Sequence, residues 1–356
     1  MMQYGHGGDI YSYAEQFPGQ AVLDFSSNVN PLGTPEPVRC AIRDAAAQCS
    51  HYPDPFCRQL TKALANKYRL APEMIFCANG AADVFFRLAD VLRPKKALLT
   101  APTFSEYAAA LSRQGCMVQY HFLSPAEGFA VTERILDALK DIDICFLCSP
   151  NNPTGCIIEP GLLRQIVRRC ERENIWLVVD ECFMDFVVNG EQYTLLPYLQ
   201  HFKRLIVVRA FTKIYAMPGV RLGWCASAAE GLSAQLYAVG QPWAVSVIAQ
   251  ACGQAALSMD GFEAYTANYI VPLRRQLAEG LRNCGMNVFG SQANYLLFYT
   301  DYHDLREKLL PHGIMLRDCS DYQGLSSGYF RIAVKNKEDN DYLIRKIQEA
   351  IWQKQL

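Results

Sequence analysis

The chain has 356 residues, of which 51% are hydrophobic and 19% are charged, and its formal net charge at pH 7 is -1. A chain of this length can bury a large core and form two domains. The balanced charge gives no field for a nucleic acid, and no apolar run approaches the roughly 18 residues of a membrane helix, so we expect neither partner.

The N-terminus lacks a basic segment followed by an apolar one, which predicts a cytoplasmic protein without a signal peptide. The 14 cysteines are scattered through apolar patterns, as expected of reduced thiols that fill a core in that compartment. Cys145 and Cys148 have the spacing of two metal ligands. No second pair completes a zinc site, so we expect no metal.

The first part of the chain is rich in turn formers such as Asn28 and Asn30. Such a segment is expected to lie over a surface. His6 stands here beside two glycines. An isolated histidine is more often simply exposed, but a segment folded over a cleft would give it a binding role. A helix is predicted over 37–48. We predict that the N-terminal segment, residues 1–45, packs against the active site and a small domain.

Strand, turn and helix alternate over residues 75–225. Short apolar runs predict strands that begin at Ile75 and that span 97–100, 118–122, 144–148, 175–180 and 205–211. This alternation is typical of a mostly parallel sheet with helices on both faces. We therefore expect a large domain over residues 46–260, with helices at 58–68 and 83–92 among those that cover its sheet.

Ligands bind beyond the carboxyl ends of the strands in such a sheet. A glycine-containing turn there leads into a helix whose first N–H groups suit a phosphate, although many such turns bind nothing. Phe104 could stack on a flat ring or pack in the core. The groups expected at this edge are Gly80, Ala81, Ala82, Phe104, Asn152, Asp180 and Lys213.

Lys213 follows a strand that reads as buried. Desolvation and a nearby cation depress the pKa of a lysine, so its free amine can attack an aldehyde. Thr212 and Arg221 can hold a phosphate beside it, through one hydroxyl and a guanidinium fork. A lysine after a strand is more often a solvated loop residue than a cofactor-binding one. The cofactor site is favoured here because chemically compatible groups stand at the ends of the other strands.

The last part of the chain predicts a smaller α+β domain over residues 261–356. A helical region over 226–285 is interrupted near Trp243, and its long second helix, 261–284, leads into this domain. Strands are predicted at 293–299, 314–317 and 329–334, and helices at 302–310 and 337–355.

The pattern of hydroxyl and Lys213, followed by Gly-x-Arg-x-Gly, resembles the lysine segment of fold-type I pyridoxal-phosphate enzymes, the aminotransferase-like group. The resemblance extends over nearly the whole chain. It implies an α/β fold with a large, mostly parallel domain and a smaller C-terminal domain, and pyridoxal 5'-phosphate as cofactor. Lys213 would bind the aldehyde, Asp180 the ring nitrogen and Asn152 the ring 3-oxygen.

Three aromatic positions bear on this resemblance. Phe183 stands where many aminotransferases carry a tyrosine that touches the ring 3-oxygen, and Tyr215 is expected to supply that hydroxyl instead. Tyr52, in His-Tyr-Pro-Asp, is similar to a tyrosine that reaches the cofactor phosphate of the neighbouring subunit. The resemblance therefore implies a homodimer with shared active sites.

Two families share most of these motifs. Histidinol-phosphate aminotransferases share Asn-Asn-Pro-Thr-Gly and the two C-terminal arginines. Threonine-phosphate decarboxylases of cobalamin biosynthesis are also similar in the N-terminal His-Gly-Gly and in Gln-x-Pro-Trp, and Phe183 favours them. The resemblance implies that Arg331 binds the α-carboxylate of the substrate. The full substrate-binding set that it implies is His6, Gly7, Asn28, Asn152, Arg317 and Arg331, with Arg317 and His6 at the phosphate.

This second resemblance implies decarboxylation of a small phosphorylated amino acid, L-threonine O-3-phosphate, to (R)-1-amino-2-propanol O-2-phosphate and carbon dioxide. Serine phosphate differs from threonine phosphate by one methyl group, and no motif distinguishes the two. A serine-phosphate decarboxylase and a histidinol-phosphate-type aminotransferase therefore remain alternatives. A non-catalytic cofactor-binding module is a third, which the set of catalytic groups disfavours.

Overall fold

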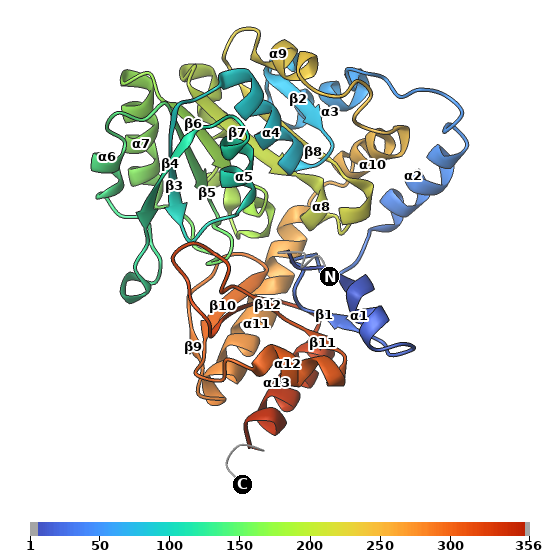
Figure 1. Ribbon diagram of the computed structural model, residues 1–356. Coiled ribbons are helices and arrows are strands. Elements are labelled where there is room, and N and C mark those ends of the chain that lie inside the picture. The colour runs from blue at the N-terminus through green and yellow to red at the C-terminus, as the bar shows by residue number, and fades with distance from the viewer. Residues whose placement is uncertain (1–5, 353–356) are drawn as a thin grey trace.

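A seven-stranded sheet forms the centre of the large domain in this computed structural model, which describes residues 6–352 (Figure 1). The strand order is β2-β8-β7-β6-β5-β3-β4. Within the described residues β8 is antiparallel to both neighbours, and the other neighbouring pairs are parallel. The strands are β2 (Ile75–Ala78), β3 (Lys96–Ala101), β4 (Met117–Phe122), β5 (Ile144–Cys148), β6 (Trp176–Asp180), β7 (Leu205–Ala210) and β8 (Gly223–Ser227).

Helices cover both faces of this sheet, which explains why its strands are almost continuously apolar. Leu177 and Val179 of β6 pack into the core on one face, and Val178 packs into the core on the other. The first face is covered by α3 (Arg58–Tyr68), α6 (Ile135–Ala138), α7 (Pro160–Arg172) and α10 (Val247–Leu257). The second is covered by α4 (Ala81–Leu92), α5 (Glu106–Ser112) and α9 (Leu232–Ala238).

The smaller domain contains a four-stranded antiparallel sheet with the order β12-β13-β10-β9. The long helix α11 (Phe262–Asn283) runs from the large domain along this sheet (Figure 1). The remaining elements are β9 (Asn287–Val288), β10 (Tyr295–Tyr299), α12 (Leu305–Leu309), β12 (Arg317–Asp318), β13 (Tyr329–Ala333) and α13 (Lys337–Trp352).

The N-terminal segment connects the two domains. After α1 (Ile10–Gln16), β1 (Leu23–Asp24) pairs in parallel with β11 (Ile314–Met315) of the small domain. The next helix, α2 (Glu36–Ala46), already packs on α10 of the large domain. The predicted boundaries of the N-terminal segment, 1–45, stay a prediction, and residues 1–5 lie outside the described residues.

The predicted fold class is confirmed, and the differences are local. The predicted strand 314–317 divides at Leu316 into β11 and β12, because its two halves pair with different partners, β1 and β13. The helix expected over 302–310 shortens to α12, which continues as a 3₁₀ turn, Leu310–His312. The last residues of the predicted helix 337–355 lie outside the described residues.

Membrane-spanning helices, clusters of metal ligands and disulfides are absent from residues 6–352. No helix there is long and apolar enough to cross a membrane. No group of three or more His, Cys, Asp or Glu side chains in that range is arranged to hold a metal ion. All 14 cysteines are free thiols, and Cys145 and Cys148 pack into opposite faces of the sheet.

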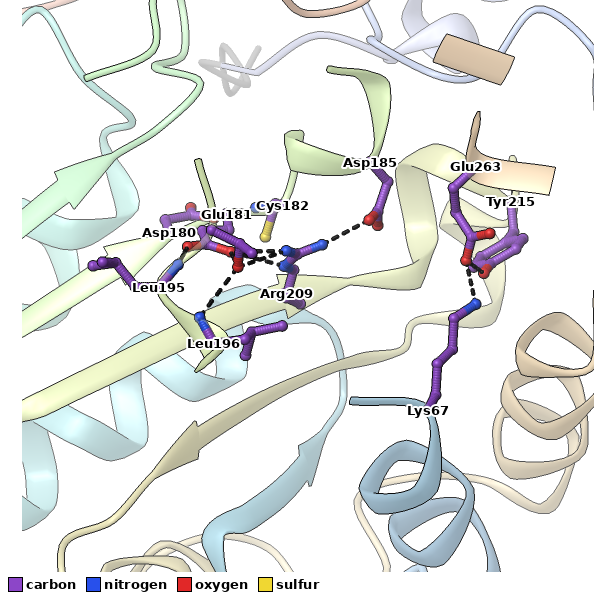
Figure 2. Close-up of polar contacts among 11 residues, drawn as sticks. Lys67, Asp180, Glu181, Cys182, Asp185, Leu195, Leu196, Arg209, Tyr215 and Glu263 are labelled. Atoms are coloured by element: carbon purple, nitrogen blue, oxygen red, sulfur yellow. Dashed lines mark hydrogen bonds and ion pairs between the residues drawn. The ribbon is translucent and has the colours of Figure 1, made fainter. Parts of the chain in front are cut away.

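A buried ion cluster lies behind the ends of β6 and β7 (Figure 2). Arg209 Nε donates to Glu181 at 3.0 Å, and its Nη1 contacts Asp185 at 2.6 Å. The second oxygen of Glu181 accepts the backbone N–H of Leu195 at 2.7 Å. The side chains of Arg209 and Glu181 are only 5% and 0% exposed, so each depends on the other for compensation of its charge.

Removing the cation of this cluster should destabilise the protein strongly. Arg209→Met would leave the buried Glu181 without its cation and would remove the main cation beside the half-buried Asp185, a change that costs about 3–5 kcal/mol at comparable sites. The free energy of unfolding in urea measures the loss. Arg39→Met is the matched control, because Arg39 pairs with Glu36 while more than half of each side chain is exposed. Equal stability of the two variants would contradict this account of the cluster.

Candidate active site

A cavity of about 560 Å³ opens at the carboxyl edge of the large sheet, between the two domains and the N-terminal segment. Its volume lies within the usual range for small-molecule and cofactor sites. Most residues predicted for the site line it, and these are His6, Gly7, Asn28, Gly80, Ala81, Ala82, Phe104, Asn152, Asp180, Thr212, Lys213, Arg221, Arg317 and Arg331. The sheet topology thus brings together groups that are far apart in the sequence.

Lys213 lies on the short helix α8 (Phe211–Ile214), which begins directly after β7. Its backbone carbonyl accepts the N–H of Asn30 at 3.1 Å, which holds the N-terminal segment against this helix. Burial lowers the pKa of the Lys213 amine to about 8, and the nearby cations of Arg331 and Arg221 contribute to the decrease. The amine can therefore lose its proton near neutral pH and act as a nucleophile.

This lowered pKa predicts how covalent capture of an aldehyde depends on pH. Only the unprotonated amine attacks, so the rate at which the apoprotein binds pyridoxal phosphate covalently should rise about tenfold per pH unit below the pKa. The rate should level off above about pH 8. Stopped-flow absorbance measures it. A rate that keeps rising toward pH 10.5, the ordinary pKa of lysine, would contradict the burial argument.

The N-terminus of α4 forms an anion cradle. Gly80 is its N-cap, has a left-handed φ of 85° and provides no side-chain cap, so the first N–H groups of the helix are open to a ligand. A Cβ on Gly80 would lie 2.7 Å from Nη2 of Arg221, so only glycine allows the guanidinium this close. Arg221 precedes the antiparallel strand β8, whose start lies at the carboxyl edge of β7. Together with the buried Thr212, these groups suit a phosphate.

Asp180 and Phe104 provide the groups that a flat, protonated ring would need. Asp180 is the last residue of β6 and is 5% exposed. Its two carboxylate oxygens accept the hydroxyl of Tyr107 at 2.5 Å and the N–H of Cys182 at 2.9 Å. Burial raises the pKa of Asp180, while hydrogen bonds with the Cys182 thiol, the Tyr107 hydroxyl and the Cys182 N–H lower it. Phe104 lines the same cavity, three residues after β3.

Two arginines enter the cavity from neighbouring strands of the small domain. Arg317 of β12 and Arg331 of β13 are direct partners across this antiparallel pair. Arg331 donates to Asn152 Oδ1 and to the carbonyl of Ser26, and its buried Nε has no hydrogen-bond partner among residues 6–352. Because Arg331 occupies the Asn152 oxygen, the Asn152 amide nitrogen is left to donate to another group. Arg317 pairs with Asp321 at 2.7 Å.

The N-terminal segment closes one side of the cavity. His6 Nε2 lies 2.8 Å from a carboxylate oxygen of Glu106 on α5. Gly7 passes so close to Ser26 that a Cβ would lie 2.1 Å from its carbonyl oxygen. Asn28 is 2% exposed, and its side-chain oxygen is buried without a hydrogen-bond partner in the part of the chain that the structure describes. An unpaired buried polar atom at a cavity wall is what a ligand-binding group requires.

Two predicted residues lie outside this cavity lining. The expectation that Tyr215 provides a hydroxyl to the cofactor ring is corrected, because that hydroxyl donates to Glu263 at 2.6 Å, beside Lys67 (Figure 2). Tyr215 thus ties α8 to the start of α11. Tyr52 is 79% exposed and stacks on Trp243, with the ring centroids 4.6 Å apart.

Sequence reasoning missed several residues of the site. Asp24, Ser26, Glu106 and Tyr322 line the cavity, and Tyr107 contacts Asp180 from behind it. Glu106 and Tyr107 open the helix that follows Phe104, so their nearness to this residue was the available signal. Nothing in the sequence pattern distinguishes Tyr322 or Asp24 from surface residues, because the small domain brings them to the site.

The chain belongs to the family of class I and II aminotransferases, whose family model matches residues 20–347. It is 34% identical to a threonine-phosphate decarboxylase of Salmonella typhimurium strain LT2, over 97% of this chain and 96% of that protein. It is 30% identical to a histidinol-phosphate aminotransferase of Caldanaerobacter subterraneus subsp. tengcongensis, over 95% of both chains.

Solved structures share the fold. A histidinol-phosphate aminotransferase from Clostridium acetobutylicum superposes with a TM-score of 0.86 at 26% identity, covering 92% of this chain and 98% of that one. An L-threonine-O-3-phosphate decarboxylase from Porphyromonas gingivalis gives 0.82 at 22% identity, covering 92% of this chain and 98% of that one. The second likeness is one of fold alone.

Membership of this family confirms the expected fold-type I architecture and its cofactor, pyridoxal 5'-phosphate. The residues present fit that group. The buried Lys213 amine suits its aldehyde, the glycine cradle beside Arg221 suits its phosphate, and the buried Asp180 carboxylate suits its ring nitrogen. The individual roles of these residues stay predictions.

Proposed function

We propose that this protein decarboxylates L-threonine O-3-phosphate to (R)-1-amino-2-propanol O-2-phosphate and carbon dioxide, a step in cobalamin biosynthesis. The observation that carries the proposal is the cross-strand pair of Arg317 and Arg331 in the same cavity as Lys213. A phosphorylated amino acid has two anionic groups, and two guanidinium groups can bind one each. The full-length similarity to a threonine-phosphate decarboxylase supports the same substrate.

Bound pyridoxal phosphate supplies an electron sink for the bond that breaks at the substrate's α-carbon. In the proposed arrangement the residues of the chain do the remaining work. Arg331 orients the α-carboxylate, while Arg317 and His6 bind the phosphate. The Lys213 amine, with its pKa lowered to about 8, is suited to deliver a proton to the α-carbon after carbon dioxide has left.

Phe183 favours decarboxylation over amino transfer. The side chain is 6% exposed, lines the cavity and packs edge-on against Tyr295, with ring centroids 4.9 Å apart. It therefore offers the cavity an apolar ring where many aminotransferases carry a hydroxyl. The aminotransferase reading remains the second candidate, because histidinol-phosphate aminotransferases are also similar over nearly the full chain.

The reaction itself tests the proposal. Purified enzyme mixed with threonine phosphate should release carbon dioxide and the amine phosphate in equal amounts, with the cofactor aldehyde retained over many turnovers. Gas release and amine analysis measure both products. Accumulation of pyridoxamine phosphate without carbon dioxide would contradict the proposal and favour the aminotransferase.

The ratio of kcat/KM for threonine phosphate and serine phosphate tests the choice of substrate. A pocket that accommodates one methyl group contributes about 1–3 kcal/mol, so we expect a preference of at least about tenfold for threonine phosphate. A preference for serine phosphate would make ethanolamine phosphate the product.

We further propose that the enzyme is a homodimer in which Tyr52 completes the site of the neighbouring subunit. Tyr52 supports this arrangement because it is 79% exposed and is absent from the cavity lining of its own chain. Its stacking on Trp243 gives it a defined direction at the surface. Exposed aromatic side chains of this kind are typical of association surfaces.

Subunit mixing tests the shared site. Tyr52→Ala and Lys213→Ala protein, refolded together, should form hybrid dimers in which one of the two sites has both residues. Activity of the mixture should exceed the sum of the separately refolded variants, and light scattering checks for dimers. A mixture that never exceeds this sum would show that Tyr52 acts within its own chain or not at all.

A further inference from the structure

Tyr107 is buried directly behind the cofactor-binding face of the site. It lies on α5 and is 0% exposed. Its ring stacks on Phe146 at 5.3 Å and meets Phe85 edge-on at 4.8 Å. It also meets Phe104, which lines the cavity, at 5.6 Å and 81°. Three aromatic rings therefore hold Tyr107 in one orientation.

Its hydroxyl group is directed at Asp180. The oxygen donates to Oδ2 of the carboxylate at 2.5 Å, a distance typical of a strong bond to a charged acceptor. Burial and the neighbouring carboxylate raise the pKa of Tyr107 well above its ordinary value, so the phenol keeps its proton and always donates. The backbone N–H of Cys182 donates to the other oxygen.

We propose that Tyr107 is a positioning residue that acts through Asp180 on the ring nitrogen of the cofactor. The two donors fix both carboxylate oxygens and so determine how the carboxylate is presented to the cavity. They also stabilise its charged form, which burial alone disfavours. A charged, fixed carboxylate holds a protonated ring nitrogen more tightly than a mobile or neutral one.

The side chains around Asp180 show why its hydrogen bond from Tyr107 matters. The other titratable side chains that face it are Cys148 of β5, Cys182 after β6 and Tyr295 of β10. None of these three is a cation, and the Tyr295 hydroxyl donates elsewhere, to the carbonyl of Asn151 at 2.8 Å. Among residues 6–352, Tyr107 is therefore the side chain that offers Asp180 a hydroxyl donor, beside the weaker hydrogen bond of the Cys182 thiol.

The inference rests on the proposed contact between Asp180 and the ring nitrogen of the cofactor. Measurements of cofactor affinity test this contact and the role of Tyr107 separately. The dissociation constants of pyridoxal phosphate and of its analogue with C–H in place of the ring nitrogen are measured on apoprotein. Tyr107→Phe keeps the ring contacts and removes only the hydroxyl. We expect it to weaken binding of the cofactor by about tenfold or more and binding of the analogue by less than about twofold.

Asp180→Asn and Tyr299→Phe are the reference variants. Asp180→Asn should also weaken binding of the cofactor more than binding of the analogue. Tyr299→Phe loses a 3.0 Å hydrogen bond to Asp301 outside the cavity, so it should change neither of the two dissociation constants. If Asp180→Asn affects both ligands equally, the ring-nitrogen assignment fails. If Asp180→Asn is selective while Tyr107→Phe is not, the role of Tyr107 is overturned.

Kinetics and a second substitution complete the test. Tyr107→Phe loaded with saturating cofactor should lower kcat with KM for the substrate unchanged, because Tyr107 does not line the cavity. Should Tyr107→Phe fail to fold, a ring-fluorinated tyrosine at this position keeps the shape and makes the hydroxyl a stronger donor. The ratio of the two dissociation constants should then change, and an unchanged ratio would overturn the proposal.

Discussion

The site depends on a lysine amine that is buried beside two arginines. Burying a charged amine is costly, and the cations of Arg331 and Arg221 add repulsion, so the pKa of Lys213 falls to about 8. The neutral amine that results is a nucleophile for an aldehyde. The same two guanidinium groups are binding groups for anions, so the interaction that activates the lysine also attracts a phosphorylated cofactor and substrate.

The sheet makes this arrangement possible. Asp180 ends a parallel strand, and Lys213, Asn152 and Phe104 each come shortly after one, so their side chains meet at one edge. The antiparallel strand β8 begins at that edge and brings Arg221 beside Gly80. The ion cluster of Arg209, Glu181 and Asp185 ties the ends of β6 and β7 together behind the site (Figure 2).

Much of this could be predicted from the sequence because local patterns determine it. Buried strands read as apolar runs, and glycine and proline mark their ends, so six of the seven strands and the residues at their carboxyl edge followed directly, whereas the antiparallel β8 was not predicted. Tyr215 was wrongly assigned because a position two residues from a lysine does not reveal its direction, which here is toward Glu263. Tyr107 was missed because its role comes from a carboxylate 73 residues away in the chain.

The most direct test of the central claim is to locate the cofactor on the chain. Borohydride reduction of the protein loaded with pyridoxal phosphate fixes the cofactor to its lysine, and mass spectrometry of the peptides identifies which one. The account predicts a single pyridoxyl phosphate group, on Lys213, and no visible cofactor band in Lys213→Ala. A group on another lysine, or Lys213→Ala protein that keeps the band and the wild-type rate, would contradict it.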